Sequence, residues 1–173
     1  MMKKTLRRLA FFGCLFACSC HKTPVEFQNS FSCKVNGVDW KPEGGTNATG
    51  GIKSLSIDVG RFNNSNLISI DALKNIRDSK TGESIIFEGI NILFYLNVTD
   101  NQWFEREPFY QYGDKNNGCS GYNIDSLSSN FVKIIGLDTV QNTVKGIFEF
   151  KAKSPTCKQI VVITDGKFEI KYQ

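Results

Sequence analysis

The feature that most constrains the fold is the regular alternation of apolar and polar residues from Phe31 onward. Gly146, Phe148 and Phe150 occupy every second position of one stretch, and the same period returns in residues 167–172 near the C-terminus. Successive side chains of a β-strand point to opposite faces, so a period of two is typical of strands with one buried face. The chain is therefore expected to be an all-β protein.

The alternating stretches predict about nine or ten short strands. The candidates are residues 31–35, 38–40, 55–59, 68–73, 84–88, 91–98, 131–137, 144–152, 160–164 and 167–172. Asn36-Gly37 and Asp165-Gly166 tolerate the positive φ of a type I′ turn, which predicts two hairpins. Short strands separated by such turns predict an antiparallel β-sandwich or a flattened β-barrel, and the alternation favours neither closure.

The N-terminus has the pattern of a secretory leader. Lys3, Lys4, Arg7 and Arg8 precede an uncharged apolar stretch at residues 9–17. A basic region followed by a short apolar region is typical of a signal peptide. The stretch is too short to span a bilayer core, which needs about 20 residues. We therefore expect no transmembrane span in the mature protein.

The end of the leader resembles the bacterial lipobox, either as Leu15-Phe16-Ala17-Cys18 or as Ala17-Cys18-Ser19-Cys20. This resemblance implies cleavage before a cysteine, a diacylglycerol group on its sulfur and acylation of the new amino group. Cys18 is favoured as the lipidated residue because leucine and alanine stand at the −3 and −1 positions before it. Cys20 is the alternative.

These features predict a lipoprotein signal peptide at residues 1–17, a polar tether at 18–30 and a single β domain at 31–173. Several acyl chains exceed the two signals needed for stable anchoring, so a membrane is the expected partner of the lipid. Without the four basic residues of the leader, the chain has 17 Lys and Arg against 17 Asp and Glu. This balance removes the electrostatic argument for nucleic-acid binding.

The domain lacks the residues of several common catalytic and metal sites. The only histidine, His21, lies in the tether. Ser-His-Asp catalysis, Cys-His catalysis and the usual histidine-based zinc sites are therefore excluded from the domain. The stretch from Asp114 begins like a calcium-binding loop, but Cys119 stands where that loop needs glycine. We predict no metal, no cofactor and no catalytic residue.

Three cysteines lie in the predicted domain. Cys33 alternates with apolar neighbours on a strand, whereas Cys119 and Cys157 lie in polar turns. A free thiol packs well as a small apolar group, and an exported protein is expected to oxidise paired thiols. The sequence therefore favours a Cys119–Cys157 disulfide, with a Cys33–Cys157 bond as the alternative.

Residues 99–130 interrupt the alternation and contain six aromatic residues. Long irregular segments are uncommon and often functional. Rigid aromatic faces with polar rims suit a sugar or a peptide. The alternative is that these rings fold beneath the segment and complete the core. The candidate binding residues are Trp103, Phe104, Arg106, Phe109, Tyr110 and Tyr112.

The two ends of the domain resemble a family of uncharacterised lipoproteins from Bacteroidota. The similarity rests on FSCKVNGVDWKP at residues 31–42 and GIFEFKAKSPTCKQIVVITDGKFEIKY at residues 146–172. It implies a β-rich lipoprotein of the outer membrane and assigns no catalytic residue. In such lipoproteins, acidic residues just after the lipidated cysteine mark export to the outer face. The first acid here is Glu26, which favours a periplasm-facing domain over a surface-exposed one.

Two short segments resemble the O-glycosylation acceptor of the same bacteria. They are Asp125-Ser126-Leu127 and Asp138-Thr139-Val140, so Ser126 and Thr139 are candidate acceptors.

The expected function is that of a non-enzymatic lipoprotein of the cell envelope that binds a partner protein or a glycan. Two alternatives remain open. An exported hydrolase would use a pair of carboxylates at catalytic separation. A lipocalin-like carrier of small ligands would need a closed barrel with a cavity.

Overall fold

The computed structural model describes residues 27–43, 54–62, 65–77, 81, 84–96, 109–114, 119 and 121–172. The described residues form no helix that could cross a membrane. Their secondary structure consists of strands: β1 (Ser30–Val35), β2 (Val38–Trp40), β3 (Leu55–Phe62), β4 (Ser65–Arg77), β5 (Ser84–Tyr95), β6 (Phe109–Asp114), β7 (Asn123–Ile124), β8 (Phe131–Asp138), β9 (Thr143–Lys153) and β10 (Ile160–Lys171).

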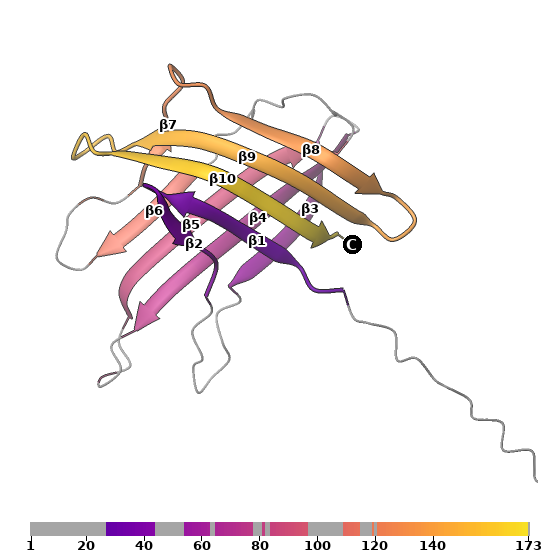
Figure 1. Ribbon diagram of the computed structural model, residues 1–173, viewed down its shortest axis with the longest axis horizontal. Helices are drawn as coiled ribbons and strands as arrows, with labels where there is room; N and C mark the ends of the chain where they lie inside the picture. The colour runs from indigo at the N-terminus through magenta and orange to yellow at the C-terminus, as the bar shows by residue number, and fades with distance from the viewer. Residues whose placement is uncertain are drawn as a thin grey trace, which may run out of the picture.

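The strands form two antiparallel sheets that lie face to face (Figure 1). The front sheet has the order β2-β1-β10-β9, and both β7 and β8 pair with the far edge of β9. The back sheet has the order β3-β4-β5-β6. The strands described in the structure remain in two separate sheets. The fold is therefore an all-β sandwich, and of the two predicted closures the flattened barrel is wrong.

The predicted alternation is confirmed on the strands of the front sheet. Gly146, Phe148 and Phe150 are buried on one face of β9, and Phe168 and Ile170 are buried on β10. The inner faces of both sheets contribute to one hydrophobic core. Burial of apolar surface is the main favourable term in folding, so the pattern that predicts the strands also supplies their stability.

Aromatic rings join the two sheets at the centre of the core. The Phe168 ring of the front sheet stacks on Phe94 of the back sheet, with ring centroids 5.2 Å apart. On the front sheet, the ring centroids of Phe148 and Phe168 are 6.4 Å apart, and those of Phe31 and Phe148 are 5.0 Å apart. A side chain at Gly146 would overlap the Phe168 ring, so glycine is required there for close packing.

A hydrogen bond also connects the sheets. Trp40 Nε1 at the end of β2 donates to Glu88 Oε2 of β5 over 2.6 Å. The chain then crosses to the back sheet, where Glu43 pairs with β4 through its backbone N–H and C=O. Because Trp40 is buried, this bond satisfies its indole N–H inside the sandwich.

The hairpin predicted at Asn36-Gly37 is confirmed. Both residues have positive φ, 51° and 82°, and Val35 pairs directly with Val38. The second predicted hairpin, at Asp165-Gly166, is wrong. Residues 160–171 form one continuous strand.

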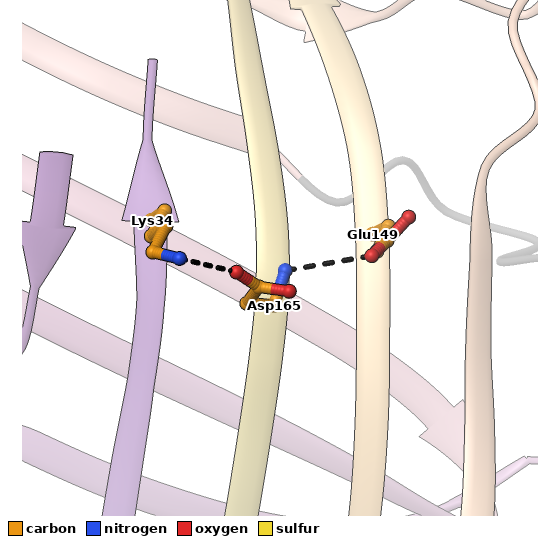
Figure 2. Close-up of polar contacts among 3 residues, drawn as sticks. All are labelled: Lys34, Glu149 and Asp165. Carbon is orange, nitrogen blue, oxygen red and sulfur yellow. Dashed lines mark hydrogen bonds and ion pairs between the residues drawn. The ribbon is translucent and has the colours of Figure 1, made fainter. Parts of the chain in front are cut away.

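Asp165-Gly166 forms a bulge within β10. Asp165 has a φ of 53°, and the pairing with β9 shifts register between Ile163 and Gly166. Lys34 of β1 and Glu149 of β9 flank the bulge (Figure 2): Lys34 Nζ lies 2.7 Å from an Asp165 carboxylate oxygen, and Glu149 Oε1 accepts from the Asp165 N–H. The hydrogen bond and charge of Lys34 lower the pKa of Asp165.

The reason for the continuous strand is that β10 lies between two partners. It pairs with β9 on one side over almost its whole length, and with β1 on the other. A hairpin would pair the two halves of β10 with each other, so β9 and β1 would lose much of their pairing with this strand. The positive φ that the Asp-Gly pair permits is used to bend the strand.

Three further expectations are corrected. Residues 84–88 and 91–98 were predicted as separate strands, but β5 is one strand that ends at Tyr95. Several strands are long rather than short, with 13 residues in β4 and 12 in β10. The segment 99–130 is not wholly irregular, because it contains β6 and β7.

The leader and most of the tether, including Cys18, Cys20 and His21, lie outside the described residues.

Replacing Gly146 with alanine is expected to destabilise the sandwich by about 1–3 kcal/mol, because the new methyl group would displace the Phe168 ring from its contact with Phe94. The free energy of unfolding, measured by urea denaturation, tests this. The matched control is Gly60→Ala on β3, where no atom lies within 4 Å of the added methyl group. Equal stability of the two variants would contradict the proposed role of Gly146.

Candidate functional site

The candidate binding residues of the segment 99–130 fall in two groups. Trp103, Phe104 and Arg106 lie outside the described residues. The backbone of Phe109 lies in β6, opposite Asn91 of β5. Tyr110 and Tyr112 also lie in β6, which is the edge of the back sheet in the described part of the chain.

Tyr110 and Tyr112 face the interior of the sandwich. Tyr110 pairs with Ile90 and Tyr112 with Glu88, both of which belong to the inner row of β5. Tyr110 is buried with 3 % of its surface exposed, whereas Tyr112 is half-buried against the core. The sequence left two roles open for these rings, ligand binding or completion of the core. Tyr110 completes the core, and Tyr112 lies at the boundary between core and solvent.

Tyr110 connects the back sheet to the front sheet through Tyr122. Tyr110 N–H donates to the Tyr122 carbonyl and Tyr122 N–H donates to the Tyr110 carbonyl, over 3.3 and 2.9 Å. Their rings meet edge to face with centroids 5.4 Å apart. The Tyr122 hydroxyl donates to Gln159 Oε1 over 3.0 Å. These contacts bring β6, the start of β7 and the start of β10 together at one end of the sandwich, on the left of Figure 1.

A hollow of about 380 Å³, which we call the tyrosine pocket, lies at this junction. Aromatic rings, amide side chains and aliphatic groups line it, with no charged group among the described lining residues. They are Asn36, Tyr110, Tyr112, Tyr122, Gln159, Ile160 and Val161. A concave site with apolar walls and a few polar groups is the usual form of a small-ligand site.

Local structure fixes the side of the tyrosine pocket formed by the β1–β2 turn. Asn36 has the positive φ of this turn, and its backbone N–H donates to the Val162 carbonyl over 2.8 Å. Its side-chain Oδ1 accepts from the Val162 N–H over 2.9 Å. With Oδ1 engaged, the Asn36 Nδ2 group has no hydrogen bond within the described structure.

A disulfide joins the two chain segments beside the pocket. Cys119 precedes Tyr122, Cys157 precedes Gln159, and the two cysteine Cα atoms are 5.8 Å apart. This is the pairing that the sequence favours. Cys33, the alternative partner, is a free and buried cysteine. The disulfide limits the separation of the segments that contain Tyr122 and Gln159.

Burial raises the pKa of two phenols that line the pocket. Burial raises the pKa of Tyr110, and the nearby Glu88 carboxylate raises it further. Burial also raises the pKa of Tyr122. Both side chains therefore remain neutral hydrogen-bonding groups near neutral pH.

A second hollow, of about 540 Å³, is lined by residues of β1, β2, β4 and β10 and by the segment that follows β2. Lysine and carboxylate side chains both line it, and Lys34 and Asp165 already form an ion pair. Its mixed charges favour neither an anionic nor a cationic ligand. The charged residues are Lys34, Asp39, Lys41, Glu43, Lys74, Asp165 and Lys167.

Catalytic and metal chemistry has little support among the described residues. No group of three or more His, Cys, Asp or Glu in the described ranges could hold a metal ion. Two described carboxyl groups have a shifted pKa, and in both the pKa is lowered. A hydrogen bond from Ser128 lowers the pKa of Asp125, and one from Lys34 lowers the pKa of Asp165. A general acid of a glycoside hydrolase needs a raised pKa instead.

Ser126 and Thr139 both lie on exposed turns. Asp125 accepts hydrogen bonds from Leu127 N–H and the Ser128 hydroxyl in the β7–β8 turn. Asp138 accepts from two backbone N–H groups in the β8–β9 turn. The aspartates of both acceptor-like segments thus have a structural role in their turns, and both hydroxyl-bearing residues are accessible.

No protein-family model, no curated protein and no solved structure matches this chain.

Sequence reasoning missed Asn36, Tyr122 and Gln159 as pocket residues. A usable signal was nevertheless present, because Tyr122 follows Cys119 by three residues and Gln159 follows Cys157 by two. The predicted disulfide therefore brings both residues to one place. Asn36 had no such signal. The Asn36-Gly37 pattern predicts a local hairpin turn but does not indicate which distant residues lie beside that turn.

Removing the disulfide with Cys119→Ser and Cys157→Ser together is expected to lower the free energy of unfolding by roughly 3–4 kcal/mol, because the bond closes a long loop in the unfolded chain. Urea denaturation under non-reducing conditions measures this difference. The control is Cys33→Ala, which leaves the bond intact. If reducing agent destabilises the double variant as much as the natural chain, the loss does not come from this disulfide.

Proposed function

We propose that this chain is a membrane-anchored lipoprotein of the cell envelope, non-enzymatic, whose β-sandwich binds a partner protein or a glycan at the tyrosine pocket. The observation on which this rests is the pocket's lining of neutral aromatic and amide side chains. Such groups bind through surface contact and hydrogen bonds. None of the described lining residues is a nucleophile or base ready for catalysis near neutral pH.

The proposed location follows from the leader. A lipid on Cys18, or on Cys20, would hold the domain at the outer membrane, and the absence of an early acidic run favours the periplasmic side. The tether at residues 18–30 would span at most roughly 45 Å when extended. The pocket would then bind partners close to the membrane surface.

Position within the fold also supports binding. The pocket lies where β6 of the back sheet meets Tyr122 and the start of β10 in the front sheet. Binding residues are commonly held in place by a rigid scaffold. The disulfide and the Tyr110–Tyr122 backbone pair provide that rigidity.

Lipidation of Cys18 is expected to be lost in Cys18→Ser and retained in Cys20→Ser. Metabolic labelling with palmitate, followed by the intact mass of the membrane-extracted protein, measures both variants. Retention in the Cys18 variant with loss in the Cys20 variant would transfer the anchor to Cys20. If the unmodified chain incorporates no palmitate, the lipoprotein proposal is refuted.

The binding function predicts that crosslinking in intact cells, followed by purification of the lipidated protein, captures a specific protein or glycan. Tyr112→Ala should reduce the captured amount by about tenfold or more, since truncating an aromatic residue that is a binding hot spot costs about 2 kcal/mol. Tyr172→Ala is the matched control, because this half-buried tyrosine lies at the opposite end of β10. Equal capture by both variants would exclude the tyrosine pocket as the binding site.

A further inference from the structure

We infer that the ligand of the tyrosine pocket is an uncharged carbohydrate, of the size of a mono- or disaccharide. This inference rests on the proposed binding function and chooses between its two classes of partner. It follows from the charge, the hydrogen-bonding groups, the size and the backbone pairing of the pocket.

The charge of the lining selects a neutral ligand. None of the seven described lining residues is a lysine, arginine, histidine, aspartate or glutamate. Glu88 acts on Tyr110 from inside the sandwich, where its carboxylate accepts the Trp40 indole N–H. An anionic ligand would have no cation to pair with at the described lining, and its desolvation would be uncompensated.

The polar groups of the rim match sugar hydroxyls. Tyr122 donates to Gln159 Oε1, so the Gln159 Nε2 group remains as a donor with no hydrogen bond in the described part of the chain. Asn36 Nδ2 is a second such donor, because Asn36 Oδ1 is engaged with Val162. Phenol oxygens can accept as well as donate. Sugar hydroxyl groups also donate and accept hydrogen bonds. They therefore match these donors and acceptors better than ligand groups that only donate or only accept.

The apolar part of the lining matches the C–H face of a sugar ring. Tyr112 presents a half-buried ring beside the aliphatic side chains of Ile160 and Val161. Aromatic faces bury apolar surface while their polar ends stay hydrated. The volume of about 380 Å³ is at the lower end of the range for small-ligand sites, which suits a short saccharide.

The backbone pairing disfavours an extended peptide. A peptide that adds to a sheet edge needs unpaired N–H and C=O groups on the edge strand. At the pocket, both backbone groups of Tyr110 in β6 are already bonded to Tyr122. At Tyr110, therefore, the edge strand has no free backbone group with which an added peptide strand could pair.

The test uses the full lipidated chain in a detergent without a sugar headgroup. Saturation-transfer NMR and calorimetric titration would use glucose, galactose, N-acetylglucosamine and maltose as neutral probes, with glucuronic acid and glucose 6-phosphate as charged counterparts. We expect at least one neutral probe to bind, and its charged counterpart to bind at least about tenfold more weakly. Gln159→Ala, an exposed position, should weaken binding by about threefold to tenfold, and Tyr122→Phe by a similar factor. Tyr172→Phe, which removes a hydroxyl at the other end of β10, should leave the affinity unchanged.

Binding of charged probes alone, binding that Gln159→Ala and Tyr122→Phe leave unchanged, or no binding to any probe would each overturn this inference. The proposed function fails separately. If cells yield a protein partner whose capture depends on Tyr112 while no saccharide binds, the function stands and the carbohydrate inference falls. If neither a partner nor a saccharide is found, both fall.

Discussion

The position of the Phe168 ring is the constraint on which the rest of the sandwich depends. The ring occupies space that any side chain at position 146 would fill, and from there it stacks on Phe94 of the opposite sheet. Phe148, Phe31 and Phe150 extend this aromatic contact along the front sheet. Aromatic side chains bury large surfaces and prefer defined ring geometries, so this cluster fixes the distance between the sheets and their mutual orientation.

The tyrosine pocket is a consequence of that fixed spacing. With the sheets held apart by phenylalanine rings at the centre, their edges approach at one end closely enough for Tyr110 and Tyr122 to share two backbone hydrogen bonds. The residues that line the hollow come from four separate places in the sequence: the β1–β2 turn, β6, the segment before β7 and the start of β10. A site of this kind exists only in the folded domain, which explains why its residues share no local motif.

The sequence predicts those parts of the fold that depend on local periodicity. Phe148 and Phe150 identify the inner face of β9 because burial imposes the same period on sequence and structure. The Asp165-Gly166 pair misleads because a turn and a bulge both use positive φ, and the partners of β10 decide between them. Tyr110 shows the same limit for the site. Its aromatic character suits binding and core packing equally, and only the pairing of β6 with β5 determines which way it faces.

Cys33 has a consequence for how the chain acquires its covalent structure. Burial, with the added effect of the Glu88 carboxylate, raises the pKa of this thiol to about 12. Attack on a disulfide requires the thiolate, so the folded domain holds its free cysteine in an unreactive form while Cys119 and Cys157 are oxidised. Once folded, the domain is protected against thiol exchange with its own Cys119–Cys157 bond. A single oxidised isomer can then persist wherever oxidation and reshuffling of disulfides compete.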